Sequence, residues 1–196
     1  MSDCGCEVDA DSAAQQSVLR YLLLINAAMF GLEVFTGILA QSTALIADSL
    51  DMLADATVYG ISLYAVGRSG RYKKRAAYLS GIFQMTLAGL VLLEVIRKFV
   101  SGSQPESTLM MGIGLVALTA NVFCLWLLAK HRQGEVHMRA SWIFSKNDVI
   151  ANLGVIGAGL LVRLLQSQLP DLVIGLAIAT LVLRGSLQIL QAARSE

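Results

Sequence analysis

Charged residues are scarce in this chain. Only 15% of its 196 residues are Asp, Glu, Lys or Arg, whereas a soluble domain typically carries about a quarter. Hydrophobic residues make up 56%, and the mean hydropathy is +0.65. The net charge is only +1, and no basic run is interleaved with aromatic residues, which argues against a nucleic-acid partner. This composition is typical of an integral membrane protein, with the lipid bilayer as its surroundings.

Cysteine, histidine and proline are also rare, with three, two and two residues respectively. Three cysteines are too few for a disulfide framework. Both prolines, Pro105 and Pro170, fall between apolar segments, where their missing N–H does no harm. The start of the chain lacks the basic and apolar regions of a cleaved signal peptide. We therefore expect the first apolar run to remain as a membrane span.

Six apolar segments follow one another, each close to the ~20 residues that a helix needs to cross a bilayer. They cover approximately residues 21–40, 43–66, 76–100, 109–129, 142–165 and 172–190. These segments predict an all-α integral membrane fold of six transmembrane helices. We expect a flexible tail at 1–17, a six-helix transmembrane domain at 18–193 and no soluble domain after it.

Lysine and arginine gather in two of the polar breaks between these segments. The basic residues of these breaks are Arg68, Arg71, Lys73, Lys74, Arg75, Lys130, Arg132 and Arg139. Cytoplasmic loops of membrane proteins carry an excess of Lys and Arg. The pattern therefore predicts that both breaks and both termini face the cytoplasm.

The second segment carries three carboxylates, Asp48, Asp51 and Asp55. On a helix these positions fall within about 60° of one another, so they share one stripe. Repulsion and loss of hydration would push protons onto such a group unless a cation bound there. A site that alternates between a protonated state and a cation-bound state would exchange protons for metal.

The fifth segment supplies a partner for this stripe. Asp148 and Asn152 share one helical face, and Asn147 lies next to it. Carboxylate and amide oxygens are ligands for divalent cations. Two carboxylates of the second segment, Asp148, and an amide or water predict a four-ligand site. Asp48, nearer the start of its segment, is a candidate helper. The cation would be the substrate, and no organic cofactor is implied.

Two weaker patterns leave alternatives open. His131 and His137 lie in a basic loop, where they either gather metal before transport or are simply solvated. Cys4 and Cys6 lie in the CGCE sequence near the start of the chain. Their thiolates are candidate ligands for a soft ion, but two ligands in a flexible tail make a weak site.

At these residues the chain resembles the cation diffusion facilitator family of metal transporters, from about Leu19 to Leu190. NAAMFGLEVFTG is similar to the family's opening pattern, and ADSLDMLADA to its signature, with Asp51 and Asp55 at the two ligand positions. Asn121 matches a recurring asparagine, and RASWIFSKNDVIANLGVI aligns with the family's His-x-x-x-Asp segment, with Asp148 at the aspartate.

The resemblance implies a six-helix homodimer that exports a divalent transition metal from the cytoplasm by proton antiport. It implies that the metal binds between the second and fifth spans. Phe144 stands where the family often has histidine, so the fourth ligand would be Asn147, Asn152, Ser145 or water. We expect Zn²⁺, while Cd²⁺, Co²⁺, Ni²⁺, Fe²⁺ and Mn²⁺ stay open. The expected location is the bacterial inner membrane.

Two other classes are compatible with parts of the pattern. An intramembrane aspartyl protease also needs two facing aspartates, but FSKNDVIANLG has no glycine-rich motif directly before Asp148. A membrane scaffold or accessory subunit fits the short length, but it would not need a stripe of acids.

Overall fold

The computed structural model describes the backbone of residues 4–65, 70–129 and 136–195. Side chains are described for residues 16–61, 63–64, 78–129, 142 and 145–191. His131 lies outside the described residues, as do the side chains of Cys4, Cys6, His137 and Phe144. The predictions made for these five residues are therefore not tested.

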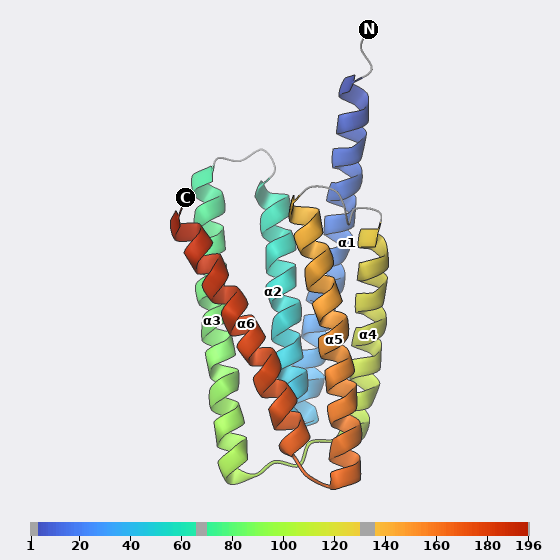
Figure 1. Cartoon of the computed structure of the whole chain (residues 1–196), viewed down its shortest axis with the longest axis vertical. Coiled ribbons are helices and arrows are strands. Elements are labelled where there is room, and N and C mark those ends of the chain that lie inside the picture. The colour runs from blue at the N-terminus through green and yellow to red at the C-terminus, as the bar shows by residue number, and fades with distance from the viewer. Residues whose placement is uncertain (1–3, 66–69, 130–135, 196) are drawn as a thin grey trace.

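The described chain forms the six predicted helices and no strand (Figure 1). They are α1 (Cys4–Leu39), α2 (Thr43–Ala65), α3 (Gly70–Ser101), α4 (Ser107–Leu128), α5 (Val136–Leu165) and α6 (Leu169–Ser195). Each predicted segment falls within or close to one helix. The predicted tail at 1–17 overlaps the first turns of α1, whose helical backbone begins at Cys4, and its flexibility stays a prediction.

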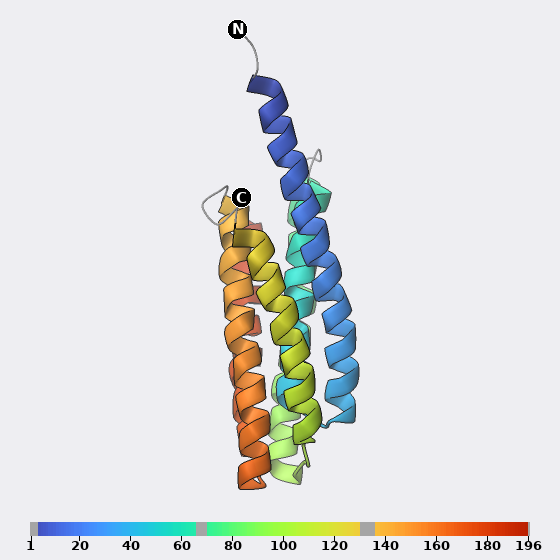
Figure 2. The same ribbon diagram turned by 90° about the vertical axis from the view of Figure 1, so that its right-hand side faces the viewer.

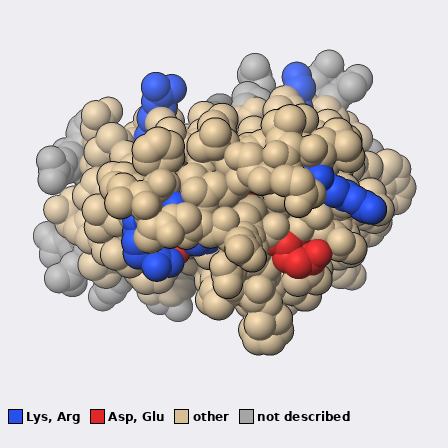
Figure 3. All heavy atoms as spheres, turned by 90° about the horizontal axis from the view of Figure 1, so that it is seen from below, with Lys and Arg blue, Asp and Glu red and all other residues tan. Residues whose placement is uncertain are grey.

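The helices run up and down in one bundle. α1 begins and α6 ends at the same end of the molecule, and α1 projects well beyond the other helices there (Figures 1 and 2). We call the opposite end, with the connections at residues 40–42, 102–106 and 166–168, the turn end. Its surface is mostly uncharged, with scattered basic groups and an acidic patch (Figure 3). Which end faces the cytoplasm stays a prediction from the positions of Lys and Arg.

Among the described residues, five helices contain a segment that is long and apolar enough to cross a membrane: Gln16–Leu39, Tyr78–Ser101, Ser107–Leu128, Ser145–Leu165 and Leu169–Gln191. Large apolar side chains such as Leu24, Phe35 and Phe83 are exposed on the outside of the bundle, as expected of a surface that faces lipid. The predicted integral membrane fold is confirmed.

α2 is the most charged of the helices in its central part, and it is also the most enclosed. It packs against α1, α3, α5 and α6, so its aspartates can face protein rather than lipid. Close packing is possible because glycines line its neighbours. A Cβ atom added at Gly175 of α6 would lie 2.9 Å from the backbone carbon of Thr43, and one at Gly37 of α1 would lie 3.1 Å from the backbone nitrogen of Ile46.

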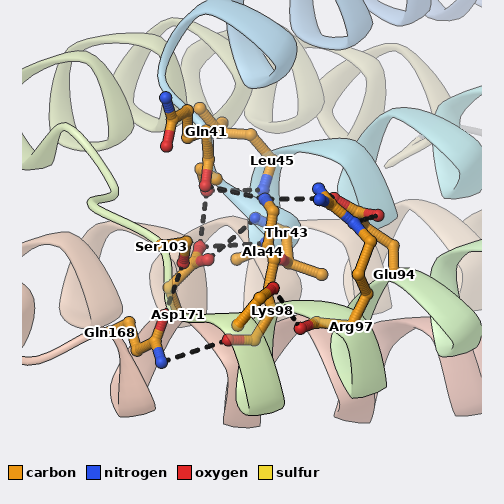
Figure 4. Close-up of polar contacts among 12 residues, drawn as sticks. Gln41, Thr43, Ala44, Leu45, Glu94, Arg97, Lys98, Ser103, Gln168 and Asp171 are labelled. Atoms are coloured by element: carbon orange, nitrogen blue, oxygen red, sulfur yellow. Dashed lines mark hydrogen bonds and ion pairs between the residues drawn. The ribbon is translucent and has the colours of Figure 1, made fainter.

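A buried carboxylate fixes the start of α2 at the turn end (Figure 4). Asp171 of α6 accepts hydrogen bonds from the Ser42 hydroxyl at 2.6 Å, the Thr43 N–H at 2.8 Å and the Ala44 N–H at 3.0 Å. The Thr43 and Ala44 N–H groups belong to the first turn of α2, where they have no partner inside the helix. We call Asp171 with these three residues the Asp171 clamp.

α3 joins the same network through a lysine. The Lys98 ammonium donates to the Gln41 carbonyl at 2.8 Å, and the Gln168 amide donates to the Lys98 carbonyl at 3.2 Å (Figure 4). The turn between α1 and α2 is therefore tied to both α3 and α6, which sets the depth of every acid on α2.

Candidate functional site

The three aspartates of α2 lie on its protein-facing side, as their helical spacing predicts. Asp48 and Asp55 are buried, with 1% and 6% of their surface exposed, and Asp51 is partly exposed. Apolar neighbours on the same helix, such as Leu50 and Met52, are buried as well. The residues around the carboxylates thus shield them from water.

α5 brings a fourth carboxylate to this stripe. Asp148 is 4% exposed and lies close enough to Asp51 and to Asp55 to form a hydrogen bond with either when one carboxyl group carries a proton. The structure therefore brings together the three acids that the sequence assigns to one site. Helix packing supplies this contact, because α5 lies directly against α2.

Two more oxygens on α5 flank Asp148. Asn152 is fully buried, and its amide N–H donates to the Asp148 carbonyl at 2.6 Å. The Asn152 Oδ1 atom is buried and has no hydrogen-bond partner, and the buried Ser145 Oγ atom lies within hydrogen-bond reach of the Tyr59 hydroxyl alone. Each has lone pairs available for a ligand, since a buried oxygen normally finds a partner. Asn147, in contrast, is exposed, so we leave it out of the ligand set.

Tyr59 belongs to the site although the sequence analysis did not select it. Its hydroxyl donates to Asp55 Oδ2 at 3.0 Å, and its side chain is fully buried. Tyr59 follows Asp55 by one helical turn, a spacing at which side chains meet. This spacing is the signal in the sequence that could have identified it.

No basic side chain neutralises these acids within the described part of the chain. The ion pairs found there join Glu94 to Arg97 and to Lys98, near the turn end of α3. A buried carboxylate without a cationic partner needs either a proton or a bound cation. Among the described residues, no three His, Cys, Asp or Glu side chains already form a group that could hold a metal ion. Binding an ion at Asp51, Asp55 and Asp148 thus requires these carboxylates to close around it.

The sequence of almost the whole chain matches a known family. Residues 19–196 match the family model described as the cation efflux transmembrane domain. The chain belongs to the cation efflux family. This finding confirms the resemblance on which the sequence analysis relied. The family consists of membrane transporters rather than enzymes, which removes the intramembrane protease as an alternative.

Several bacterial relatives are similar over most of this chain. The zinc transporter ZitB of Escherichia coli (strain K12) is 28% identical over 188 residues, which cover 88% of this chain and 59% of the relative. The metal cation efflux system protein CzcD of Cupriavidus metallidurans is 25% identical over 157 residues, which cover 74% and 50%. A cadmium, cobalt and zinc/H(+)-K(+) antiporter of Bacillus velezensis is 22% identical over 189 residues, which cover 89% and 60%.

The chain spans between half and three fifths of the length of these relatives. With the apolar helices, the bacterial relatives support the expected place of the protein as an integral protein of the inner membrane.

Proposed function

We propose that this protein exports a divalent transition-metal cation from the cytoplasm in exchange for protons. The observation that carries this proposal is the meeting of Asp51 and Asp55 of α2 with Asp148 of α5, all within the membrane-spanning bundle. Three facing carboxylates without a basic partner form a site for positive charge. Because protons and metal ions neutralise the same groups, they compete for it.

The proposed cycle uses this competition. In the inward-facing state the three carboxylates lose protons and bind the metal, with Asn152 or Ser145 as a further oxygen ligand. Rearrangement of the helices then exposes the site to the other side, where protons displace the metal. A site near the middle of the membrane with helices moving around it is the general arrangement of secondary transporters.

The proposed substrate is Zn²⁺ or a related ion. Zinc prefers four ligands in a tetrahedron, for which carboxylate oxygens are suitable. A ligand set of oxygens alone also suits Mn²⁺ and other harder ions. The panel of ions to be tested for transport therefore contains Zn²⁺, Cd²⁺, Co²⁺, Ni²⁺, Fe²⁺ and Mn²⁺. The names of the ZitB, CzcD and antiporter relatives support a metal substrate and proton exchange. The homodimer stays a prediction, which the mass of the purified protein in detergent tests.

Transport by the purified protein in lipid vesicles tests the proposal. With a pH gradient across the vesicle membrane, we expect Zn²⁺ or another ion of the panel to move against the proton flow. Asp51→Asn and Asp148→Asn should abolish this movement, because each removes a charged ligand without changing side-chain size. Glu94→Gln is the matched control, since Glu94 pairs with Arg97 on α3. Full transport by Asp148→Asn would disprove the site, and wild-type metal tolerance in Asp51→Asn cells would favour a scaffold.

A further inference from the structure

Two other carboxylates are buried in the bundle without any partner. Glu33 of α1 has no exposed surface and Asp48 of α2 has 1%. Neither oxygen of either carboxylate has a hydrogen-bond partner. Leaving a buried polar group unpaired is destabilising, and more so when the group is charged. Four unpaired oxygen atoms therefore indicate that something absent from the protein chain itself satisfies them.

The packing of α1 on α2 places these two acids at the same depth. Gly37, one turn after Glu33, lies against α2: a Cβ atom there would lie 3.0 Å from the Ile46 side chain and 3.2 Å from that of Leu45. Glu33 precedes the end of α1 by six residues and Asp48 follows the start of α2 by five. At 1.5 Å per residue both lie about 8–9 Å from the turn between the helices. Asp48 is the strongest charged neighbour of Glu33.

This pair lies apart from the metal site. Asp51 and Asp55 follow the start of α2 by eight and twelve residues, which places them about 12 and 18 Å along the helix. The pair is therefore nearer the turn end, by about 3 Å relative to Asp51 and about 10 Å relative to Asp55. Neither carboxylate of the pair is hydrogen-bonded to Asp51.

Among the side chains that the structure describes, the helices around the pair supply no basic group to neutralise it. Asp51 is a charged neighbour of both Glu33 and Asp48, and Asp148 of α5 is a charged neighbour of Asp48. Both neighbours carry negative charge and repel the pair. On α3, Lys98 is hydrogen-bonded to the Gln41 carbonyl at the turn end and pairs with Glu94. α4 has no charged residue between Ser107 and Leu128. On α6, Asp171 is engaged in the clamp and Arg184 is exposed. No described ion pair reaches Glu33 or Asp48.

The number of oxygens decides which cation fits. Zn²⁺ takes about four ligands and harder divalent ions take about six or more. The pair offers only two side chains, whereas three carboxylates meet at Asp51, Asp55 and Asp148. Two neighbouring buried carboxylates that cannot both be ionised can instead hold a proton on one of them.

We propose that Glu33 and Asp48 form a proton-binding site that is separate from the metal site and lies between it and the turn end. One proton, held by either carboxylate, leaves the pair with a single negative charge. The role of this site rests on the proposed function: when the metal leaves, the pair passes its proton one helical turn to Asp51 and takes up another from the turn-end side.

Infrared difference spectroscopy of the full chain in lipid tests the proton directly. At neutral pH, with Zn²⁺ added to replace protons at Asp51, Asp55 and Asp148, we expect a band of a protonated carboxyl group that shifts in heavy water. The band should disappear in Glu33→Gln and in Asp48→Asn but remain in the control Glu94→Gln. Size-exclusion profiles identify any variant that does not fold, and either variant alone suffices for the test. A wild type without such a band, or a band of full intensity in the folded variants, would overturn the proposal.

Metal binding and proton flux separate this proposal from the transport function. Zn²⁺ binding should survive in Glu33→Gln, whereas the number of protons moved per ion should fall and the pH profile of transport should shift. Loss of Zn²⁺ binding in both Glu33→Gln and Asp48→Asn would assign the pair to the metal site and overturn the proposal. If the wild type moves no ion of the panel, the transport function fails, while the infrared result still decides whether the pair holds a proton.

Discussion

Removing the Asp171 carboxylate should loosen the attachment of α2 to α6. Asp171 is fully buried and accepts three hydrogen bonds, two of them from backbone N–H groups of the first turn of α2. Asp171→Ala leaves these donors without an acceptor in a region closed to water. Each unpaired buried donor costs about 1–3 kcal/mol. Because the Ser42 hydroxyl also accepts from the Leu45 N–H at 3.1 Å, we assign it the lower limit, and the total is about 3–7 kcal/mol.

Thermal unfolding of the purified protein in detergent measures this loss. For a chain of this size, 1 kcal/mol corresponds to about 2–4 °C in Tm, so Asp171→Ala should lower Tm by on the order of 10 °C. Asp171→Asn should have about half the effect, because its amide keeps one acceptor oxygen but turns its N–H₂ group toward a donor.

Glu106 provides the matched control. It is an exposed carboxylate that caps the start of α4, accepting from the Leu109 N–H at 2.7 Å and the Thr108 N–H at 3.1 Å. An exposed cap contributes about 1 kcal/mol, since water replaces the lost acceptor. If Asp171→Ala lowers Tm no more than Glu106→Ala does, the reasoning about the buried clamp is wrong.

Two further predictions concern pH and packing. The Leu109 and Thr108 N–H groups lower the pKa of Glu106 below its ordinary value of 4.5, so its stabilisation is complete above that value and is lost as pH falls through the lowered pKa. Wild type and Glu106→Gln should therefore differ in Tm at neutral pH and converge in acid; a constant difference would contradict this. Gly175→Ala should destabilise the protein by about 1–3 kcal/mol, because its Cβ would lie 2.9 Å from the Thr43 backbone. Gly89→Ala, with no atom within 4 Å, should stabilise it by about 0.5–1 kcal/mol, and equal effects of the two substitutions on Tm would refute the packing argument.

Much of the fold could be predicted because the apolarity of each segment indicates whether it lies in the membrane or in water. A run of about 20 apolar residues has no stable place outside a bilayer or a core, and in a bilayer it must be helical to satisfy its backbone. The predicted segment at 43–66 corresponds to α2 at Thr43–Ala65 within one residue at either end. The prediction for the N-terminal region was less exact, because the polar residues before Tyr21 can continue a helix beyond the membrane, and α1 begins at Cys4.

The candidate site was predictable only in part. Helical spacing alone places Asp48, Asp51 and Asp55 on one stripe, and Asp148 with Asn152 on another. It does not distinguish among the three acids of α2, since they differ by only about 60° around the helix. The position of Asp48 nearer the start of its segment made it a helper, and the resemblance to the family then selected Asp51 and Asp55. Asn147 was retained as a candidate because the sequence does not show which side of α5 faces the bundle.

The sequence by itself determined six helices, their membrane environment and the presence of acids that need a positive charge, because these follow from local apolarity and helical period. Only the tertiary structure decided which acids face each other. The glycine contacts of α2 and the Asp171 clamp set its depth and rotation, and packing against α5 and α1 then places Asp51 and Asp55 beside Asp148 and Asp48 beside Glu33. Such pairings depend on contacts between helices that are far apart in the chain, and no pattern within a single helix contains them.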